Sequence, residues 1–157
     1  MTSAVTGVRS TTEIDTLAFG ERLGTRLQAG DLILLSGQLG AGKTVLVRGI
    51  AAGMGIDPAV VRSPTFVLHH VYRAGARALH HIDLYRLGPH ADIRLLDIDD
   101  MLESGGVVVV EWGEYADLLA ETQVRIVIDI EDDGARRLTP SRVPERLAPV
   151  WSRGTAR

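Results

Sequence analysis

The chain has 157 residues, among which are no cysteine, no asparagine and only one lysine. Without cysteine, disulfide bonds, cysteine-based zinc sites and cysteine nucleophiles are excluded. No run of apolar residues approaches the length that a membrane-spanning helix needs. The first residues also lack the basic start and long apolar segment of a secretory signal. We therefore expect a cytoplasmic protein that does not act at a membrane.

The charge of the chain also limits its function. The formal net charge is −3, whereas a protein that binds nucleic acid over its whole surface needs clustered positive charge to neutralise phosphates. A local arginine patch remains compatible with this composition. A hydrophobic content of 45% at this length suits one sizeable core, so we expect a single domain.

The single lysine, Lys43, lies in the segment Gly-Gln-Leu-Gly-Ala-Gly-Lys-Thr at residues 37–44. This segment fits the phosphate-binding pattern G-x-x-x-x-G-K-[ST]. Its glycines let successive backbone N–H groups turn inward around phosphates, and the following helix adds the positive end of its dipole. Lys43 can then reach the β- and γ-phosphates, and the hydroxyl of Thr44 can bind Mg²⁺.

The surroundings of this loop distinguish it from a glycine-rich turn that matches by chance. Residues 31–36 form an apolar run that suits a buried strand, and residues 45–54 have helical spacing. A strand before the loop and a helix after it are the context that the motif requires. The sequence therefore predicts a nucleoside triphosphatase or kinase site.

The base of the nucleotide can be predicted as well. Guanine-specific GTPases of this class typically read the base through Asn-Lys-x-Asp, whose asparagine and aspartate satisfy the guanine edge. The chain has no asparagine, and its only lysine already belongs to the phosphate loop. ATP is therefore the expected nucleotide.

The order of apolar patterns is typical of an α/β protein. The expected helices cover residues 12–28, 45–54, part of 92–103 and 114–119, and the expected strands cover residues 31–36, 67–73, 78–84, 107–110, 124–130 and 136–139. Thr12 and Asp15 have the spacing of a capping box at the start of the first helix. The two strands around Gly75 are expected to form an antiparallel hairpin.

These elements predict one P-loop NTPase-like domain at residues 1–140, with a central mixed β-sheet flanked by helices. From residue 140 onward the apolar pattern fades into a Pro- and Arg-rich segment. We expect residues 141–157 to form a mobile C-terminal tail.

Two acidic residues stand at the ends of predicted strands. Glu111 follows the four valines at 107–110, and Asp83 follows residues 78–82. A phosphate loop needs a carboxylate that holds Mg²⁺ or positions the attacking group, and such groups lie at the carboxyl ends of sheet strands. Either residue can instead cap a turn or pair with an arginine. Glu111 fits the metal role well, and Asp83 is the other candidate.

Four of the five histidines form two adjacent pairs, at residues 69–70 and 80–81. Adjacent residues on a strand point to opposite faces, so neither pair can ligate one metal ion from there. Ordinary strand histidines are favoured over a histidine metal cluster.

Four segments of the chain carry a resemblance to a known family. They are Gly-Gln-Leu-Gly-Ala-Gly-Lys-Thr at 37–44, Ser-Pro-Thr-Phe at 63–66, His-Ile-Asp-Leu-Tyr-Arg at 81–86 and Val-Glu-Trp at 110–112. Their order and spacing resemble TsaE, formerly YjeE, a family of bacterial ATPases in tRNA threonylcarbamoyladenosine biosynthesis, across about residues 10–140. A phosphate loop alone occurs in many families, whereas the other three motifs together are specific. Gln38 departs from the family, which commonly has aspartate there, so any charged contact of that side chain is in doubt.

The resemblance implies roles for the matching positions. Lys43, Asp83 and Thr65 are implied as catalytic, with Thr65 in a switch-like loop that senses the γ-phosphate. The implied metal site consists of Thr44, Glu111 and Asp83. The implied nucleotide-binding residues are Gly37, Gln38, Leu39, Gly40, Ala41, Gly42, Lys43, Thr44, Val45 and Trp112.

Three further family positions have roles that the resemblance leaves open. Trp112 can stack near the nucleotide or pack as a core aromatic beside a strand end. Arg86 can contact a phosphate or a partner, or form a surface ion pair. The role of Tyr85 is open.

The implied function is that of a Mg²⁺-dependent ATPase subunit for threonylcarbamoyladenosine modification of tRNAs that read codons beginning with A. ATP hydrolysis is then expected to drive the cycle of a transferase formed by TsaD and TsaB, and TsaC supplies threonylcarbamoyl adenylate. The chain is expected to meet tRNA through this complex. Hydrolysis by the isolated chain is expected to be slow, because switch loops are often ordered only by a partner.

Two other functions are compatible with a phosphate loop. A small-molecule kinase needs a mobile, arginine-bearing lid, but residues 89–105 are acidic and poor in arginine, which disfavours it. A nucleotide-responsive binding module without useful turnover also fits, because binding and hydrolysis use overlapping residues.

Overall fold

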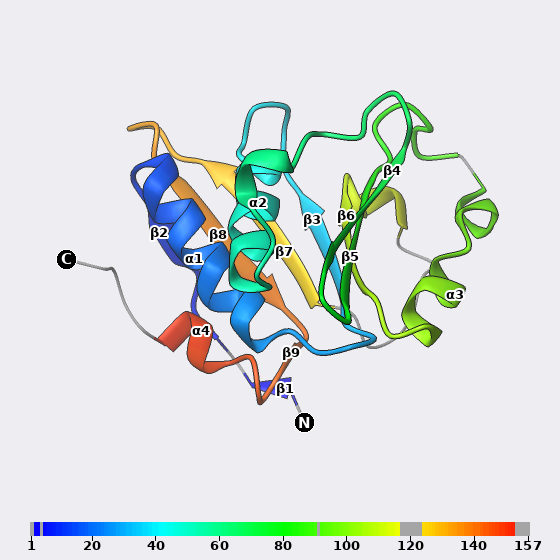
Figure 1. The fold of residues 1–157 in the computed structure, drawn as a ribbon. Helices are drawn as coiled ribbons and strands as arrows, with labels where there is room; N and C mark the ends of the chain where they lie inside the picture. Colours follow the sequence, from blue (N-terminus) through cyan, green and yellow to red (C-terminus); the bar gives the residue numbers. More distant parts are fainter. Residues whose placement is uncertain (1, 4, 91, 117–123, 153–157) are drawn as a thin grey trace.

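A seven-stranded mixed sheet forms the centre of the fold, in the order β2-β8-β7-β3-β6-β5-β4 (Figure 1). The computed structural model describes residues 2–3, 5–90, 92–116 and 124–152. The strands of the sheet are β2 (Val8–Ser10), β3 (Leu32–Ser36), β4 (His69–Ala74), β5 (Arg77–Asp83), β6 (Val107–Glu111), β7 (Val124–Ile130) and β8 (Arg136–Ser141). The predicted α/β class with a central mixed sheet is confirmed.

The strand directions explain where the site forms. Strand β3 runs parallel to β6 and β7, and β6 runs parallel to β5, whereas β4, β8 and β2 pair antiparallel with their neighbours. Parallel strands carry their carboxyl ends to one edge of a sheet. The loop after β3 therefore meets the ends of β5 and β6, where Asp83 pairs in register with Glu111.

Helices α1 (Glu13–Arg26) and α2 (Lys43–Gly53) lie side by side on one face of this sheet (Figure 1). The predicted capping box starts α1. The Asp15 N–H donates to Thr12 Oγ1 at 3.1 Å, and the Thr12 N–H donates to Asp15 Oδ2 at 3.2 Å. This box fixes the start of α1 beside the loop that follows β3.

An apolar core covers each face of the sheet. On the face below α1 and α2, the buried side chains include Leu79, Val107 and Val109. On the other face, Val108 and Val110 belong to a second core with Ile98, the first residue of α3 (Ile98–Glu103). All four valines of β6 are buried, as expected for a strand that is covered on both faces.

Short elements complete the described part of the chain. They are the 3₁₀ helices η1 (Pro58–Val60), η2 (Ile93–Leu96) and η3 (Gly113–Ala116), the short strand pair β1 (Thr2–Ser3) and β9 (Val143–Pro144), and helix α4 (Pro149–Ser152). The helix expected at residues 114–119 begins as η3, and its last three residues lie outside the described part. Among the described residues, no helix is long and apolar enough to cross a membrane.

The C-terminal segment differs from the expectation of a mobile tail. Strand β8 continues to Ser141, and Leu147, Val150 and Trp151 are buried in the core below α1. The Trp151 ring packs edge-on against Phe19 of α1, with 5.2 Å between the ring centroids. Three apolar residues at helical spacing outweigh the proline and arginine content that suggested disorder. The domain therefore extends to residue 152, and residues 153–157 lie outside the described part.

Candidate active site

A cavity of about 590 Å³ opens at the carboxyl edge of the sheet, between the loop after β3 and the start of α1. Most of the predicted site residues line this cavity. They are Leu39, Gly40, Ala41, Gly42, Lys43, Thr44, Val45, Thr65, Asp83, Glu111 and Trp112. The fold thus brings together residues from four distant segments of the sequence.

The glycines of the loop leave open space where phosphates would lie. Gly40 and Gly42 have φ angles of 80° and 107°, in the left-handed region that favours glycine. A Cβ added to either residue would meet no heavy atom within 4 Å. Helix α2 begins directly afterwards at Lys43, and no side chain caps its first N–H groups. Such uncapped N–H groups, at the positive end of a helix dipole, form an anion-binding site.

The Lys43 side chain lies at the base of the loop. Its ammonium group donates hydrogen bonds to the carbonyl oxygens of Gly37 and Gln38, the latter at 3.0 Å. It also lies 4.2 Å from the centroid of the Trp112 ring, where a cation is attracted to the ring face. Gly37 and Gln38 do not line the cavity, but their hydrogen bonds with Lys43 connect them to it.

Burial lowers the pKa of Lys43, and the carboxylates of Glu111, Glu114 and Asp83 act in the opposite direction. Among the described residues, no carboxylate lies within ion-pair distance of this ammonium group. Backbone carbonyls are its hydrogen-bond partners instead. A polyanionic ligand would offer Lys43 the charged partner that it lacks.

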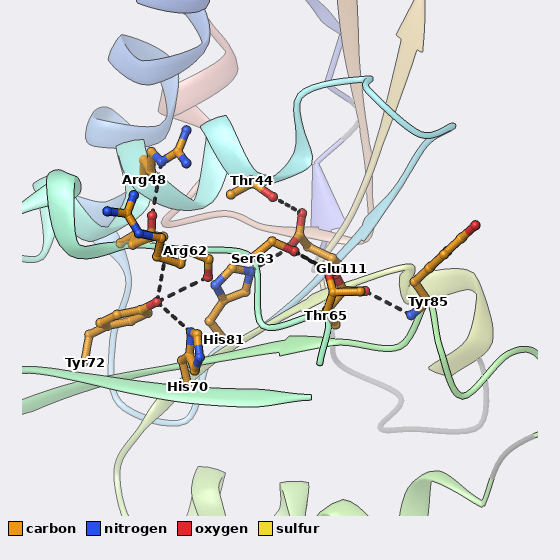
Figure 2. A network of polar contacts seen from close by, with 12 residues as sticks. Thr44, Arg48, Arg62, Ser63, Thr65, His70, Tyr72, His81, Tyr85 and Glu111 are labelled. Carbon is orange, nitrogen blue, oxygen red and sulfur yellow. Dashed lines mark hydrogen bonds and ion pairs between the residues drawn. The ribbon is translucent and has the colours of Figure 1, made fainter. Parts of the chain in front are cut away.

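Glu111 links the phosphate loop to the sheet. Thr44 Oγ1, in the first turn of α2, donates to Glu111 Oε1 at 2.8 Å. The other carboxylate oxygen accepts a hydrogen bond from His81 Nε2, also at 2.8 Å (Figure 2). Glu111 and His81 are buried, with exposed side-chain fractions of 3% and 0%. Glu111 thus lies against the phosphate loop, and among the described residues its two oxygens have Thr44 and His81 as partners rather than an arginine.

Asp83 holds the segment that contains Thr65. Its Oδ2 atom accepts hydrogen bonds from Ser63 Oγ at 3.0 Å and Thr65 Oγ1 at 3.2 Å, and its Oδ1 atom accepts one from the Tyr85 N–H at 2.9 Å. The side chain therefore does two things. It caps the turn after β5, which was one of the expected alternatives, and it ties residues 63–65 to the floor of the cavity.

Trp112 lies at the border between the cavity and the second core. Its ring lines the cavity and also packs against the second core, with 5.0 Å between its centroid and that of Tyr85. Its φ angle of 59° is uncommon for a residue other than glycine. Arg86 is exposed, and its guanidinium carbon lies 4.9 Å from the centroid of the exposed Phe66 ring.

The structure adds residues that sequence reasoning missed. Arg136, at the start of β8, donates to the carbonyl oxygens of Ala41 and Gly40, each at 3.2 Å. Thr11 and Glu13 line the cavity beside the capping box. The capping box was visible in the sequence, but nothing in the pattern indicated that this helix start would lie beside the loop.

Within each adjacent histidine pair, the two side chains lie on opposite faces of the sheet. His80 Nδ1 lies 2.9 Å from His69 Nε2, whereas His81 faces Glu111. His70 instead lies 3.0 Å from the hydroxyl of Tyr72. Within the described residues, no group of three or more histidine, aspartate or glutamate side chains is arranged to hold a metal ion.

The comparisons with known proteins agree on one family. Residues 10–138 match the family model described as "Threonylcarbamoyl adenosine biosynthesis protein TsaE". The chain is 48% identical over 126 residues to the tRNA threonylcarbamoyladenosine biosynthesis protein TsaE of Mycobacterium leprae, covering 73% of this chain and 76% of the relative. It is 44% identical over 137 residues to the protein of the same name from Streptomyces coelicolor, covering 82% and 91%.

More distant relatives agree with this result. The TsaE protein of Bacillus subtilis is 34% identical over 133 residues, covering 84% of this chain and 82% of the relative. The crystal structure of Bacillus subtilis YdiB superposes with a TM-score of 0.75 at 29% identity, covering 94% of this chain and 93% of that chain. The family match includes the phosphate loop and both strand-end acids. The chain therefore belongs to the TsaE family of tRNA threonylcarbamoyladenosine biosynthesis proteins.

Proposed function

We propose that this protein is a Mg²⁺-dependent ATPase whose hydrolysis of ATP serves the threonylcarbamoyladenosine modification of tRNA. One observation carries the proposal. The hydrogen bond of 2.8 Å between Thr44 and Glu111 joins the hydroxyl of the phosphate loop to a buried carboxylate. These are the two kinds of protein oxygen that hold Mg²⁺ beside the phosphates in this class of site.

The loop suits the phosphates of ATP. Lys43 lacks an ion-pair partner in the described structure, and the N–H groups at the start of α2 are uncapped. The open space above Gly40 and Gly42 is the cradle that a Cβ would begin to fill. On binding, Lys43 exchanges its carbonyl partners for phosphate oxygens, and the backbone N–H groups hold the remaining negative charge.

The donor set suits magnesium. Mg²⁺ prefers oxygen ligands and usually takes one or two carboxylates together with phosphate oxygens and water, so a cluster of three acidic side chains is not required. Thr44 Oγ1 and Glu111 Oε1 supply two protein oxygens. When bound, the ion neutralises negative charge that develops on the transferred phosphoryl group.

Asp83 and Thr65 connect this site to a loop that can respond to the γ-phosphate. Ser63 and Thr65 together occupy the two lone-pair directions of Asp83 Oδ2, so a further donor to this oxygen must replace one of them. In the proposal, the attacking water donates a hydrogen bond to Asp83 Oδ2 in place of the Thr65 hydroxyl. Thr65 shares this oxygen and senses the change, because its hydroxyl competes for the same lone pairs.

The nucleoside occupies the other end of the cavity. This end is lined by Thr11 and Glu13 at the start of α1 and by Arg136. The chain contains no asparagine for guanine recognition, which favours ATP over GTP. The backbone groups at this helix start offer hydrogen-bonding partners without requiring a dedicated side chain.

Family membership supports the biological setting of the proposal. We infer that hydrolysis drives the cycle of a TsaD and TsaB transferase complex, which modifies tRNAs that read codons beginning with A. The acidic net charge of the chain fits indirect contact with tRNA through this complex. If the loop at residues 63–66 reaches its catalytic arrangement only with a partner, turnover is slow in the isolated chain.

The test is ADP production by the purified chain with ATP and Mg²⁺, alone and after addition of cognate TsaB and TsaD. The Lys43→Ala variant controls for contaminating ATPases. We expect turnover that depends on Lys43 and increases with both partners. Turnover that is independent of Lys43 would remove the proposed site, whereas indifference to the partners would favour a kinase or an unrelated ATP-driven switch.

A further inference from the structure

The buried contact between His81 and Glu111 has no assigned role in the function described above. The two side chains come from neighbouring strands, β5 and β6, and are separated by 2.8 Å. Both are almost completely buried, at 0% and 3% exposure. A hydrogen bond between two buried side chains is costly to break, because a polar group left without a partner in the interior carries a desolvation penalty.

The alternation of side chains along β5 explains why a histidine can reach this position. Residues two apart on a strand point to the same face, so His81 and Asp83 both face the side of the sheet covered by α2. Asp83 pairs in register with Glu111 of β6. His81 pairs in register with Val109, two residues before Glu111, and its ring reaches diagonally across to the Glu111 carboxylate.

The geometry divides the two oxygens of Glu111 between different donors. Oε1 faces Thr44, which belongs to the phosphate loop, and Oε2 faces His81, which belongs to the sheet (Figure 2). An ionised carboxylate only accepts hydrogen bonds, so His81 Nε2 carries a proton. The other ring nitrogen, Nδ1, has no hydrogen-bond partner among the described residues. The complete burial of the ring restrains it, and its hydrogen bond among the described residues goes to Glu111.

We propose that His81 is a positioning residue that holds the Glu111 carboxylate with Oε1 directed at the metal position. This inference rests on the proposed function. The terminal torsion of a glutamate side chain is broad, so an unanchored carboxylate can rotate away from the metal. Thr44 cannot serve as the permanent anchor, because its hydroxyl is itself a proposed magnesium ligand. The hydrogen bond from His81 remains available in both states and keeps the carboxylate in place.

Three variants separate positioning from simple structural support. His81→Leu removes the donor, whereas His81→Gln restores an N–H group near the position of Nε2. His80→Leu is the matched control, since His80 is buried on the same strand but contacts His69 on the opposite face. Each variant is first compared with the wild type by thermal melting, so that the binding data come from folded protein.

The readout is binding, measured apart from turnover. The affinity for Mn²⁺, which stands in for Mg²⁺ and is detected by electron paramagnetic resonance, is measured in the presence of ATP. The affinity for ATP without metal is measured by calorimetry. We expect His81→Leu to weaken Mn²⁺ binding by about tenfold or more, in the range typical of lost hydrogen bonds to metal ligands. Metal-free ATP binding should stay unchanged, His81→Gln should recover part of the loss, and His80→Leu should match the wild type.

Two results would overturn the inference while leaving the proposed function intact. One is wild-type Mn²⁺ affinity in His81→Leu, and the other is an equal loss of metal-dependent and metal-free ATP binding, which indicates general damage to the site. If the wild type itself binds no ATP or metal, the proposed function fails, and the inference fails with it. Should His81→Leu not fold, His81→Gln and His81→Asn give the same comparison, because only glutamine presents an N–H group near Nε2.

Discussion

The close contact between α1 and α2 predicts a loss of stability when Gly24 is replaced by alanine. A Cβ at this position would lie 2.2 Å from the carbonyl oxygen of Ile50 and 3.1 Å from Cα of Gly53. Ordinary contacts of a Cβ begin at 3.4 Å. The obstacle is helix backbone, which cannot rotate aside as a flexible side chain can. The two helices must therefore move apart by about 1 Å to admit the methyl group.

The expected magnitude follows from two opposing effects. In an exposed helix interior, alanine is favoured over glycine by about 1 kcal/mol. Overpacking a close-packed contact costs about 1–3 kcal/mol, and the rigid obstacle places Gly24→Ala at the upper end of this range. The net loss in the free energy of unfolding is therefore about 2 kcal/mol. For a domain of this size, this loss corresponds to a Tm lower by about 4–8 °C.

Urea unfolding and thermal melting of Gly24→Ala measure this loss. The matched control is Glu21→Ala, which changes an exposed residue of the same helix to the same side chain. We expect the control to melt at or slightly above the wild-type temperature. If Gly24→Ala proves as stable as the wild type or more so, the helices are not in the close contact described here, and the reasoning fails.

Three further predictions concern the site, the histidines and the C-terminal segment. Lys43→Ala should abolish ATP turnover with little change in Tm, and wild-type turnover would refute the site. Burial, together with neighbouring charges, lowers the pKa of His69 and His80 below the ordinary value of 6.5. The unfolded chain then takes up protons below about pH 6.5 that the folded chain does not, so the free energy of unfolding should fall as the pH drops through this range. In the double variant His69→Gln, His80→Gln, thermal melts should show a Tm that depends less on pH in this range than in the wild type. An equal pH dependence would contradict the lowered pKa of these two histidines. Trp151→Ala should lower the free energy of unfolding by about 3 kcal/mol in urea titrations. An unchanged free energy of unfolding would show that Trp151 does not pack against α1.

The parts of the fold that could be predicted from sequence depend on local patterns. Valines 107–110 indicated a strand covered on both faces, and the loop at 37–44 required a strand before it and a helix after it. Because the carboxylates that a phosphate loop needs lie at the carboxyl ends of sheet strands, the strand-end acids Asp83 and Glu111 could be assigned to the edge where the loop lies. The structure places both acids there.

The parts that could not be predicted depend on contacts between distant residues. Arg136 reaches the carbonyl oxygen of Ala41 across 95 positions of sequence, and no pattern near either residue indicates this pairing. Strand β2 has three residues, too few for a periodicity to emerge. Trp151 was assigned to a mobile tail because composition was averaged over residues 141–157, whereas its burial depends on the surface that α1 offers to it.

His81 shows how a site residue can be missed despite a visible signal. Its position two residues before Asp83 places both side chains on one face of a strand. Of the adjacent pair at 80–81, only His81 shares this face with the strand-end acid, and this spacing is visible in the sequence.

The most direct test of the central claim is the Mg²⁺ dependence of ADP release, measured for the wild type and Glu111→Gln in the presence of TsaB and TsaD. Glutamine keeps the size of the side chain and removes its charge. We predict saturable Mg²⁺-dependent release by the wild type, and a requirement for Mg²⁺ about tenfold higher or more in the variant. Superimposable Mg²⁺ curves for the two proteins, or release that does not require Mg²⁺, would contradict the account.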